Sequence, residues 1–131
     1  MTFVDTSAIF ALLAANDEHH PAALAAMSEL RGTAQLITHS YIVLETHALT
    51  ERRVGHLAIR ALHRDVLPLL DIRWVDPALH DAAVTASLAA ERGSVSLVDR
   101  VSFEFMRRER IDAAFTFDSD FASQGYRTLP H

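Results

Sequence analysis

The stretch Thr2-Phe3-Val4-Asp5-Thr6-Ser7 opens the chain with a short apolar segment that ends on an acid and two hydroxyl residues. An apolar segment with such a polar break is typical of a short buried strand. Thr6 or Ser7 can then cap a helix over residues 8–15. The stretch therefore predicts a strand that leads directly into a helix, with Asp5 at the junction.

The same alternation continues along the chain. Apolar periodicity and Gly or Pro breaks predict further helices over about 18–30, 40–53, 77–93 and 97–108, with a helical pair separated near Gly55 that continues to about 70. Further strands are expected at 35–38, 72–75, 113–117 and, at an edge, 126–129. Strands that alternate with helices predict the α/β class, a three-layer α/β/α sandwich with a short, mostly parallel sheet.

Length and composition indicate one domain over residues 1–131, because 131 residues of which 50% are hydrophobic can bury a sizeable core. The longest apolar runs, such as 9–15, are far shorter than the roughly 18–20 residues of a membrane span. No signal-peptide pattern precedes them, and cysteine is absent. We therefore expect a cytoplasmic protein that does not contact a membrane and has no disulfide or thiolate chemistry.

The basic residues are twelve arginines and no lysine, which excludes P-loop and Schiff-base chemistry. The net charge of −5 argues against broad electrostatic adhesion to nucleic acid. It leaves nucleic acid open as a substrate, because bound Mg²⁺ would change the local sign of the charge. Arginines also cluster at 52–53, 60–64 and 107–110.

Four acids stand where an apolar element ends or faces inward: Asp5, Glu45, Asp99 and Asp118. Carboxylates brought together in this way repel one another unless a divalent cation lies between them. Strand ends are also where sites lie in parallel α/β sheets. The pattern suggests a metal-dependent enzyme, and a phosphodiester is the substrate that best fits such a pocket.

Local structural explanations compete for two of these acids. Asp5 could be no more than the N-cap of the first helix. Glu45 shares an apolar helical stripe with Ile42 and Leu49, so it needs a partner, which could be a metal or a buried arginine such as Arg52 or Arg53.

The other two acids have similar alternatives. Asp99 falls on a stripe with Phe103 and Met106, but Ser96 to Asp99 also fits a capping box. Asp118 or Asp120 could form an Asx-turn, and we favour Asp118 as the metal ligand with Asp120 as an accessory acid. The eight histidines form no regular zinc pattern, and no aromatic base-stacking patch is visible in the sequence.

Four blocks together resemble the PIN-domain family, and within it the VapC-type ribonuclease toxins of bacterial toxin–antitoxin pairs. The blocks are Val4 to Ser7, Ser40 to Thr46, Ser96 to Asp99 and Thr116 to Phe121, and their order, their element types and the chain length all agree. The resemblance covers essentially the whole chain and implies a single PIN-like domain.

The resemblance implies a Mg²⁺- or Mn²⁺-dependent endoribonuclease in which Asp5, Glu45, Asp99 and Asp118 are catalytic metal ligands. Asp120 is a candidate further ligand. Thr6, Ser7 and Thr116 are expected to support the pocket, and Asp17 and His20 match a structural pattern. An RNA substrate, a cognate antitoxin and a homodimer are the implied partners.

Two rivals remain at this stage. A haloacid-dehalogenase-like phosphatase would also place an acid after the first strand, but it needs a second acid where Ser7 stands and a lysine that the chain lacks. A catalytically silent α/β module that binds a partner through its arginine clusters is the other.

Overall fold

In the computed structural model, which describes residues 1–91, 93 and 95–131, five short strands pair side by side in the order β3-β2-β1-β4-β5. All four strand pairs are parallel, so every strand ends at the same edge of the sheet. The strands are β1 (Thr2–Val4), β2 (Leu36–His39), β3 (Asp71–Arg73), β4 (Ala113–Phe115) and β5 (Arg127–Leu129).

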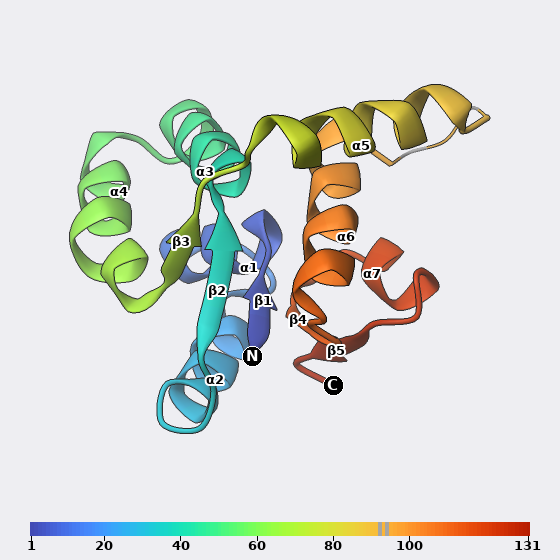
Figure 1. Cartoon of the computed structure of the whole chain (residues 1–131). Coiled ribbons are helices and arrows are strands. Elements are labelled where there is room, and N and C mark those ends of the chain that lie inside the picture. Colours follow the sequence, from blue (N-terminus) through green and yellow to red (C-terminus); the bar gives the residue numbers. More distant parts are fainter. Residues whose placement is uncertain (92, 94) are drawn as a thin grey trace.

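Helices lie on both sides of this sheet, with α6 on the near side and α1 on the far side in Figure 1. This arrangement confirms the predicted α/β sandwich and its parallel sheet. The helices are α1 (Thr6–Leu13), α2 (His20–Leu30), α3 (Ser40–Arg53), α4 (His56–Ala61), α5 (Pro77–Ala89), α6 (Leu97–Glu109) and α7 (Asp120–Ser123), with a π-helical turn η1 (Leu62–Val66) and a 3-10 turn η2 (Leu67–Leu69) after α4.

Element boundaries differ from the sequence predictions in instructive ways. Strand β4 ends at Phe115 rather than at residue 117. The Thr116 N–H still bonds to the Leu129 carbonyl of β5, but the N–H groups of Phe117 and Asp118 bond to the hydroxyls of Ser7 and Thr116 and not to a neighbouring strand. Helix α5 ends at Ala89, before Gly93. The short helix α7 was not predicted. No helix in the described residues is long and apolar enough to cross a membrane.

Aromatic packing joins β1 to the helices on one side of the sheet. The Phe3 ring lies 5.9 Å from the rings of Phe105 in α6 and Phe121 in α7, and all three side chains are fully buried. Burial of each such side chain contributes about 1.5–3 kcal/mol relative to leaving it exposed. This core fixes α6 against the strand that leads into Asp5.

His39 is a buried histidine that caps α3 and ties β2 to α6. Its Nδ1 accepts a hydrogen bond from the Ile42 backbone N–H at 3.4 Å, so Nε2 carries the proton and donates to Ser102 Oγ at 2.9 Å. Ser102 Oγ in turn donates to the Val98 carbonyl. Burial lowers the pKa of His39 to about 3, so the ring is neutral in the folded protein.

The His39 environment predicts a specific loss of stability in acid. The folded pKa is depressed below the unfolded value near 6.5, so this contribution is complete above pH 6.5 and is lost as the pH falls toward 3. Between these pH values we expect the free energy of unfolding of wild type to fall by about 1.4 kcal/mol per pH unit relative to that of His39→Asn. The Asn side chain can still cap the helix but has no ring that titrates. Urea unfolding of both proteins at pH 7, 6 and 5 measures this difference. A difference that is independent of pH would show that His39 is not held neutral.

Candidate active site

Asp5 lies at the carboxyl end of β1 and is almost completely buried. Its Oδ2 accepts hydrogen bonds from Ser7 Oγ at 2.7 Å, from Thr116 Oγ1 at 3.0 Å and from the Ser7 backbone N–H at 3.4 Å. Asp5 is therefore the N-cap of α1, and the prediction that Thr6 or Ser7 caps this helix is wrong. Ser7 instead donates to the capping carboxylate.

Two hydroxyl groups connect Asp5 to the segment after β4. The Phe117 backbone N–H donates to Ser7 Oγ at 2.9 Å, and the Asp118 N–H donates to Thr116 Oγ1 at 3.0 Å. Each hydroxyl has one proton, and both Ser7 and Thr116 donate it to Asp5. The 3.1 Å contact between Ser7 Oγ and Thr116 Oγ1 is therefore not a hydrogen bond. The network holds Asp118 in a fixed position relative to Asp5.

Thr6 supports the site indirectly. It is buried, and its Oγ1 accepts a hydrogen bond from Thr46 Oγ1 at 3.3 Å. This bond links α1 to α3, the helix that carries Glu45. Of the three residues predicted to support the pocket, Ser7 and Thr116 bond to Asp5, whereas Thr6 positions a helix.

Asp99, Asp118 and Asp120 form a cluster in which one carboxylate oxygen from each lies within 4.8 Å of the others. Asp118 Oδ1 also accepts the Asp120 backbone N–H at 2.9 Å, which is the Asx-turn that the sequence left open. Asp120 begins α7, and its carboxylate lies in the cluster. The turn therefore brings both acids to Asp99.

The four predicted acids interact electrostatically around Asp99. Burial is the largest of the effects that raise the pKa of Asp99 to about 7, and the negative charges of Asp5, Asp118 and Glu45 contribute to this shift in that order. Burial also raises the pKa of Asp5, while its hydrogen bonds from Ser7 and Thr116 oppose that shift. The fold thus places together carboxylates that are costly to ionise together.

Asp99 lies among the other acids and also takes part in the cap of α6. Its backbone N–H donates to Ser96 Oγ at 3.1 Å, so Ser96 caps α6 as a capping box predicts. The Ser96 backbone N–H lowers the pKa of the Asp99 carboxyl, but burial and two neighbouring acids have larger effects. The cap positions Asp99 without neutralising it.

The prediction that Glu45 lies on the inward face of α3 is wrong. The buried residues of this helix are Ile42, Thr46 and Thr50, so Glu45 lies beside the buried stripe and is partly exposed. The buried residues are spaced four apart, and this spacing keeps them on one face of the helix. The predicted stripe of Ile42, Glu45 and Leu49 had a different spacing. The alternative of a buried pair with Arg52 or Arg53 is wrong, since no ion pair within 4.0 Å joins them in the described residues.

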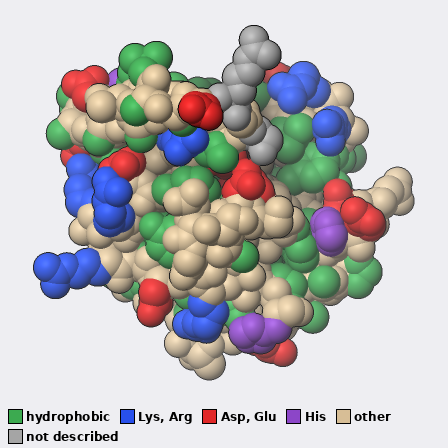
Figure 2. Space-filling view, turned by 90° about the vertical axis from the view of Figure 1, so that its right-hand side faces the viewer, with side chains coloured by type: hydrophobic (Ala, Val, Ile, Leu, Met, Phe, Trp, Pro, Cys, Tyr) green, Lys and Arg blue, Asp and Glu red, His purple; other side chains and the backbone are tan. Residues whose placement is uncertain are grey.

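Among the described residues, no arginine or histidine lies within ion-pair distance of the acids. Within residues 1–91, 93 and 95–131, no ion pair involves Asp5, Glu45, Asp99, Asp118 or Asp120. Figure 2 shows acidic side chains near the middle of one face, with arginines at several places around them. A set of carboxylate oxygens without a cationic partner suits a hard divalent cation such as Mg²⁺ or Mn²⁺.

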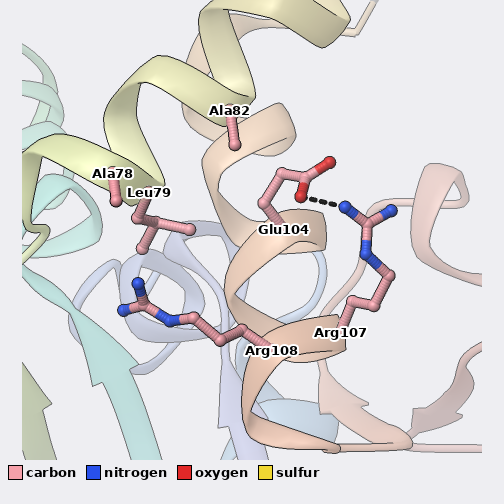
Figure 3. Close-up of a pocket in the computed structure, with 6 residues that line it drawn as sticks. All are labelled: Ala78, Leu79, Ala82, Glu104, Arg107 and Arg108. Atoms are coloured by element: carbon pink, nitrogen blue, oxygen red, sulfur yellow. Dashed lines mark hydrogen bonds and ion pairs between the residues drawn. The ribbon is translucent and has the colours of Figure 1, made fainter.

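A separate hollow of about 210 Å³ lies between α5 and α6 and contains none of the predicted site residues. Figure 3 shows Glu104 at its edge, pointing toward Arg107, with which it forms an ion pair. Arg108, also at this hollow, pairs with Asp76 at 3.0 Å. Two arginines of the 107–110 cluster are therefore engaged in ion pairs within the fold.

The sequence analysis missed one aromatic pair, which includes the residue before Asp118. The rings of His19 and Phe117 stack with centroids 4.3 Å apart and an angle of 13° between their planes. These residues are far apart in sequence, and no local spacing joins them. Only the position of Phe117 directly before Asp118 could have drawn attention to it.

The fold and the site define an α/β protein with an acidic site, of the kind that holds a divalent cation, at the carboxyl edge of a parallel sheet. The model of the PIN domain matches residues 2–125. The 23S rRNA-specific endonuclease VapC20 of Mycobacterium tuberculosis is 31% identical over 127 residues, which is 96% of this chain and 95% of that protein.

Solved structures agree. The crystal structure of M. tuberculosis VapC20, described as a sarcin-ricin loop cleaving toxin, superposes with a TM-score of 0.82 at 30% identity and covers 96% of each chain. FitAcB from Neisseria gonorrhoeae has the same fold, with a TM-score of 0.69 at 15% identity over 98% of this chain and 96% of that one. The chain belongs to the PIN-domain family, as the sequence motifs predicted.

The electrostatics of Asp99 predict that Asp99→Asn stabilises the metal-free protein. The folded pKa near 7 exceeds the unfolded value of 3.8, so the penalty is complete above pH 7 and disappears as the pH falls toward 3.8. We expect a gain on the order of 1 kcal/mol at pH 8, because water screens this partly exposed carboxylate. Urea unfolding in EDTA at pH 8 and pH 5 measures it, with the exposed Asp65→Asn as the matched control. A larger gain at pH 5 than at pH 8 would contradict this account.

Proposed function

We propose that this chain is a Mg²⁺- or Mn²⁺-dependent endoribonuclease that acts as the toxin of a toxin–antitoxin pair, with residues 1–131 as one nuclease domain. The observation that carries the proposal is the acid cluster around Asp99, which forms no ion pair with any described residue, in a chain homologous to a ribosomal RNA endonuclease over nearly its whole length. A cytoplasmic location follows from the substrate.

The acids would divide the work as follows. Asp5, Glu45, Asp99 and Asp118 would hold the cation, with Asp120 as a further ligand. Ser7 and Thr116 would keep the Asp5 carboxylate in one orientation through their hydrogen bonds. A divalent cation bound there would supply the positive charge that a scissile phosphodiester and its leaving oxygen require.

Hydrolysis would proceed by direct attack of water, which a cation held by carboxylates can activate without a thiol, amine or Ser–His nucleophile. Cysteine and lysine are absent. The Ser7 hydroxyl donates to Asp5. Ser102 pairs with His39, but both side chains are fully buried, so no substrate can reach them.

The two rival functions are weaker. A phosphatase of the haloacid-dehalogenase type would need an acid at position 7, where Ser7 supports Asp5 instead. A silent binding module would use its arginine clusters, and in one of the three clusters Arg107 and Arg108 form ion pairs within the fold.

The test of the enzyme is RNA cleavage in the presence and absence of metal. We expect wild type to cleave RNA with Mg²⁺ or Mn²⁺, to stop in EDTA and to recover when metal is added back. Asp99→Asn should remain folded but lose activity, because it removes a cation ligand, whereas Asp65→Asn should cleave normally. Both metals should raise the melting temperature of wild type by mass action, and by less in Asp99→Asn. Cleavage that continues in EDTA, or a fully active Asp99→Asn, would refute the metal mechanism.

The proposal includes a homodimer and a cognate antitoxin. A groove of about 730 Å³ beside edge strand β3 is lined mainly by apolar side chains, including Leu44 and Trp74. Trp74 is 82% exposed and Leu44 is 69% exposed, which is unusual for large apolar residues unless a protein partner covers them. This groove supports a protein contact but does not distinguish the two partners.

The acid cluster predicts how the antitoxin would silence the enzyme. Carboxylates without a cationic partner attract a guanidinium or ammonium group as well as a metal ion. We expect the antitoxin to insert an Arg or Lys side chain into the cluster, so Asp5→Asn or Asp118→Asn should weaken the complex about tenfold or more. Titration calorimetry with and without Mn²⁺ measures this effect, and Mn²⁺ should compete. If neither the substitutions nor Mn²⁺ changed the affinity for the antitoxin, the neutralising contact would lie elsewhere.

A further inference from the structure

An aromatic platform includes the residue that directly precedes Asp118 of the acid cluster. It consists of the His19 ring stacked on the Phe117 ring, with centroids 4.3 Å apart and planes 13° from parallel. Phe117 immediately precedes Asp118, while His19 comes from the connection between α1 and α2. The fold therefore stacks a ring from a distant segment on the residue that immediately precedes an acid of the cluster.

Phe117 is fixed by the same network that orients the acids. Its backbone N–H donates to Ser7 Oγ at 2.9 Å, and Ser7 Oγ donates to Asp5. The Phe117 ring also packs edge-on against the buried Phe115 ring, with centroids 6.3 Å apart. These contacts hold Phe117 in a fixed position relative to Asp5 and Asp118.

His19 is held by its loop and leaves part of its ring open. The His19 backbone N–H donates to Asp17 Oδ1 at 2.8 Å, and His20 Nδ1 bonds the Ala11 carbonyl at 2.6 Å. The His19 side chain is 45% exposed, although Phe117 covers one face of the ring. Glu18 meets the ring at Nε2, at 3.4 Å, which is its edge. Among the described residues, Phe117 is the aromatic ring that stacks on His19, and nearly half of the His19 side chain stays open to solvent.

We propose that the open part of the His19 ring, backed by Phe117, stacks a base of single-stranded RNA next to the phosphodiester that the acid cluster cleaves. The inference rests on the proposed ribonuclease function. Proteins read unpaired RNA by stacking splayed bases on aromatic side chains, His included. Stacking tolerates different bases because each has a π-face, so the platform would position a nucleotide and not specify its sequence.

A cation for the RNA backbone stands across the same loop. Arg53 at the end of α3 lines a hollow of about 370 Å³ together with Asn16 and Asp17, which belong to the loop that carries His19. No ion pair within 4.0 Å engages Arg53 in the described part of the chain. An arginine placed in this way can meet a phosphate of the strand whose base lies on His19.

The experiment measures RNA binding without turnover. Random-sequence single-stranded RNA that contains 2-aminopurine is titrated with Asp99→Asn protein in Mg²⁺, with and without further changes at His19. Fluorescence anisotropy gives Kd, and quenching of 2-aminopurine reports stacking directly. We expect quenching, and a Kd that rises about 5- to 150-fold in His19→Ala, which corresponds to about 1–3 kcal/mol.

Variants separate stacking from a structural role. His19→Phe keeps a stacking ring and should keep Kd and quenching, whereas His19→Leu covers Phe117 without one and should resemble His19→Ala. The control His63→Ala removes an exposed histidine from a ring pair elsewhere, with His47 at 5.1 Å, and should change nothing. Equal losses in His19→Phe, His19→Leu and His19→Ala, accompanied by lower melting temperatures, would mean that His19 only packs against Phe117.

Failure of the platform and failure of the proposed function give different results. If wild type cleaves RNA and the Asp99→Asn protein binds it, but His19→Ala binds equally well with unchanged quenching, the platform alone is refuted. If wild type neither binds nor cleaves RNA in Mg²⁺ or Mn²⁺, the ribonuclease function fails and the platform fails with it.

Discussion

Mutual repulsion among carboxylates at one edge of the sheet is the constraint on which this structure depends. Asp5 is buried and its pKa is raised, and its charge helps to raise the pKa of Asp99 to about 7. A fold that concentrates acids in this way is less stable than one without them. The aromatic core of Phe3, Phe105 and Phe121 offsets that cost, because it locks α6 and α7 against β1.

Parallel topology explains why distant acids meet at one point. Asp5 follows β1 and Asp118 follows β4, and these strands are parallel neighbours in the sheet. The Ser7 and Thr116 hydroxyls then fix the spacing between the two strand ends. Parallel sheets in general collect sites at the carboxyl ends of their strands. Here the hydrogen bonds of two side chains give the carboxylates at these ends a defined arrangement.

Sequence reasoning found the elements and the acids because both leave local signals. The alternation of strands and helices can be read within a few residues, and so can the acids that follow an apolar strand or interrupt an apolar helical stripe. Contacts between distant segments leave no such signal. The pairing of Asp5 with Thr116, the stacking of His19 on Phe117 and the His39–Ser102 bond all join separate elements. Periodicity also misplaced Glu45, because the packing of α3 against its neighbours, and not its hydrophobic pattern, decides which face is buried.

The distribution of arginines has a consequence for how RNA can be held. The chain carries a net charge of −5, and Arg73, Arg107 and Arg108 already pair with acids of the fold. Long-range attraction therefore contributes little, and binding has to come from contacts close to the site. A cation among the carboxylates, a base stacked on His19 and a phosphate near Arg53 are three such contacts. Each of these contacts is short-ranged, so an RNA strand would be held firmly only where its phosphate, base and backbone all fit. A protein of acidic overall charge could in this way select among RNA segments by their shape.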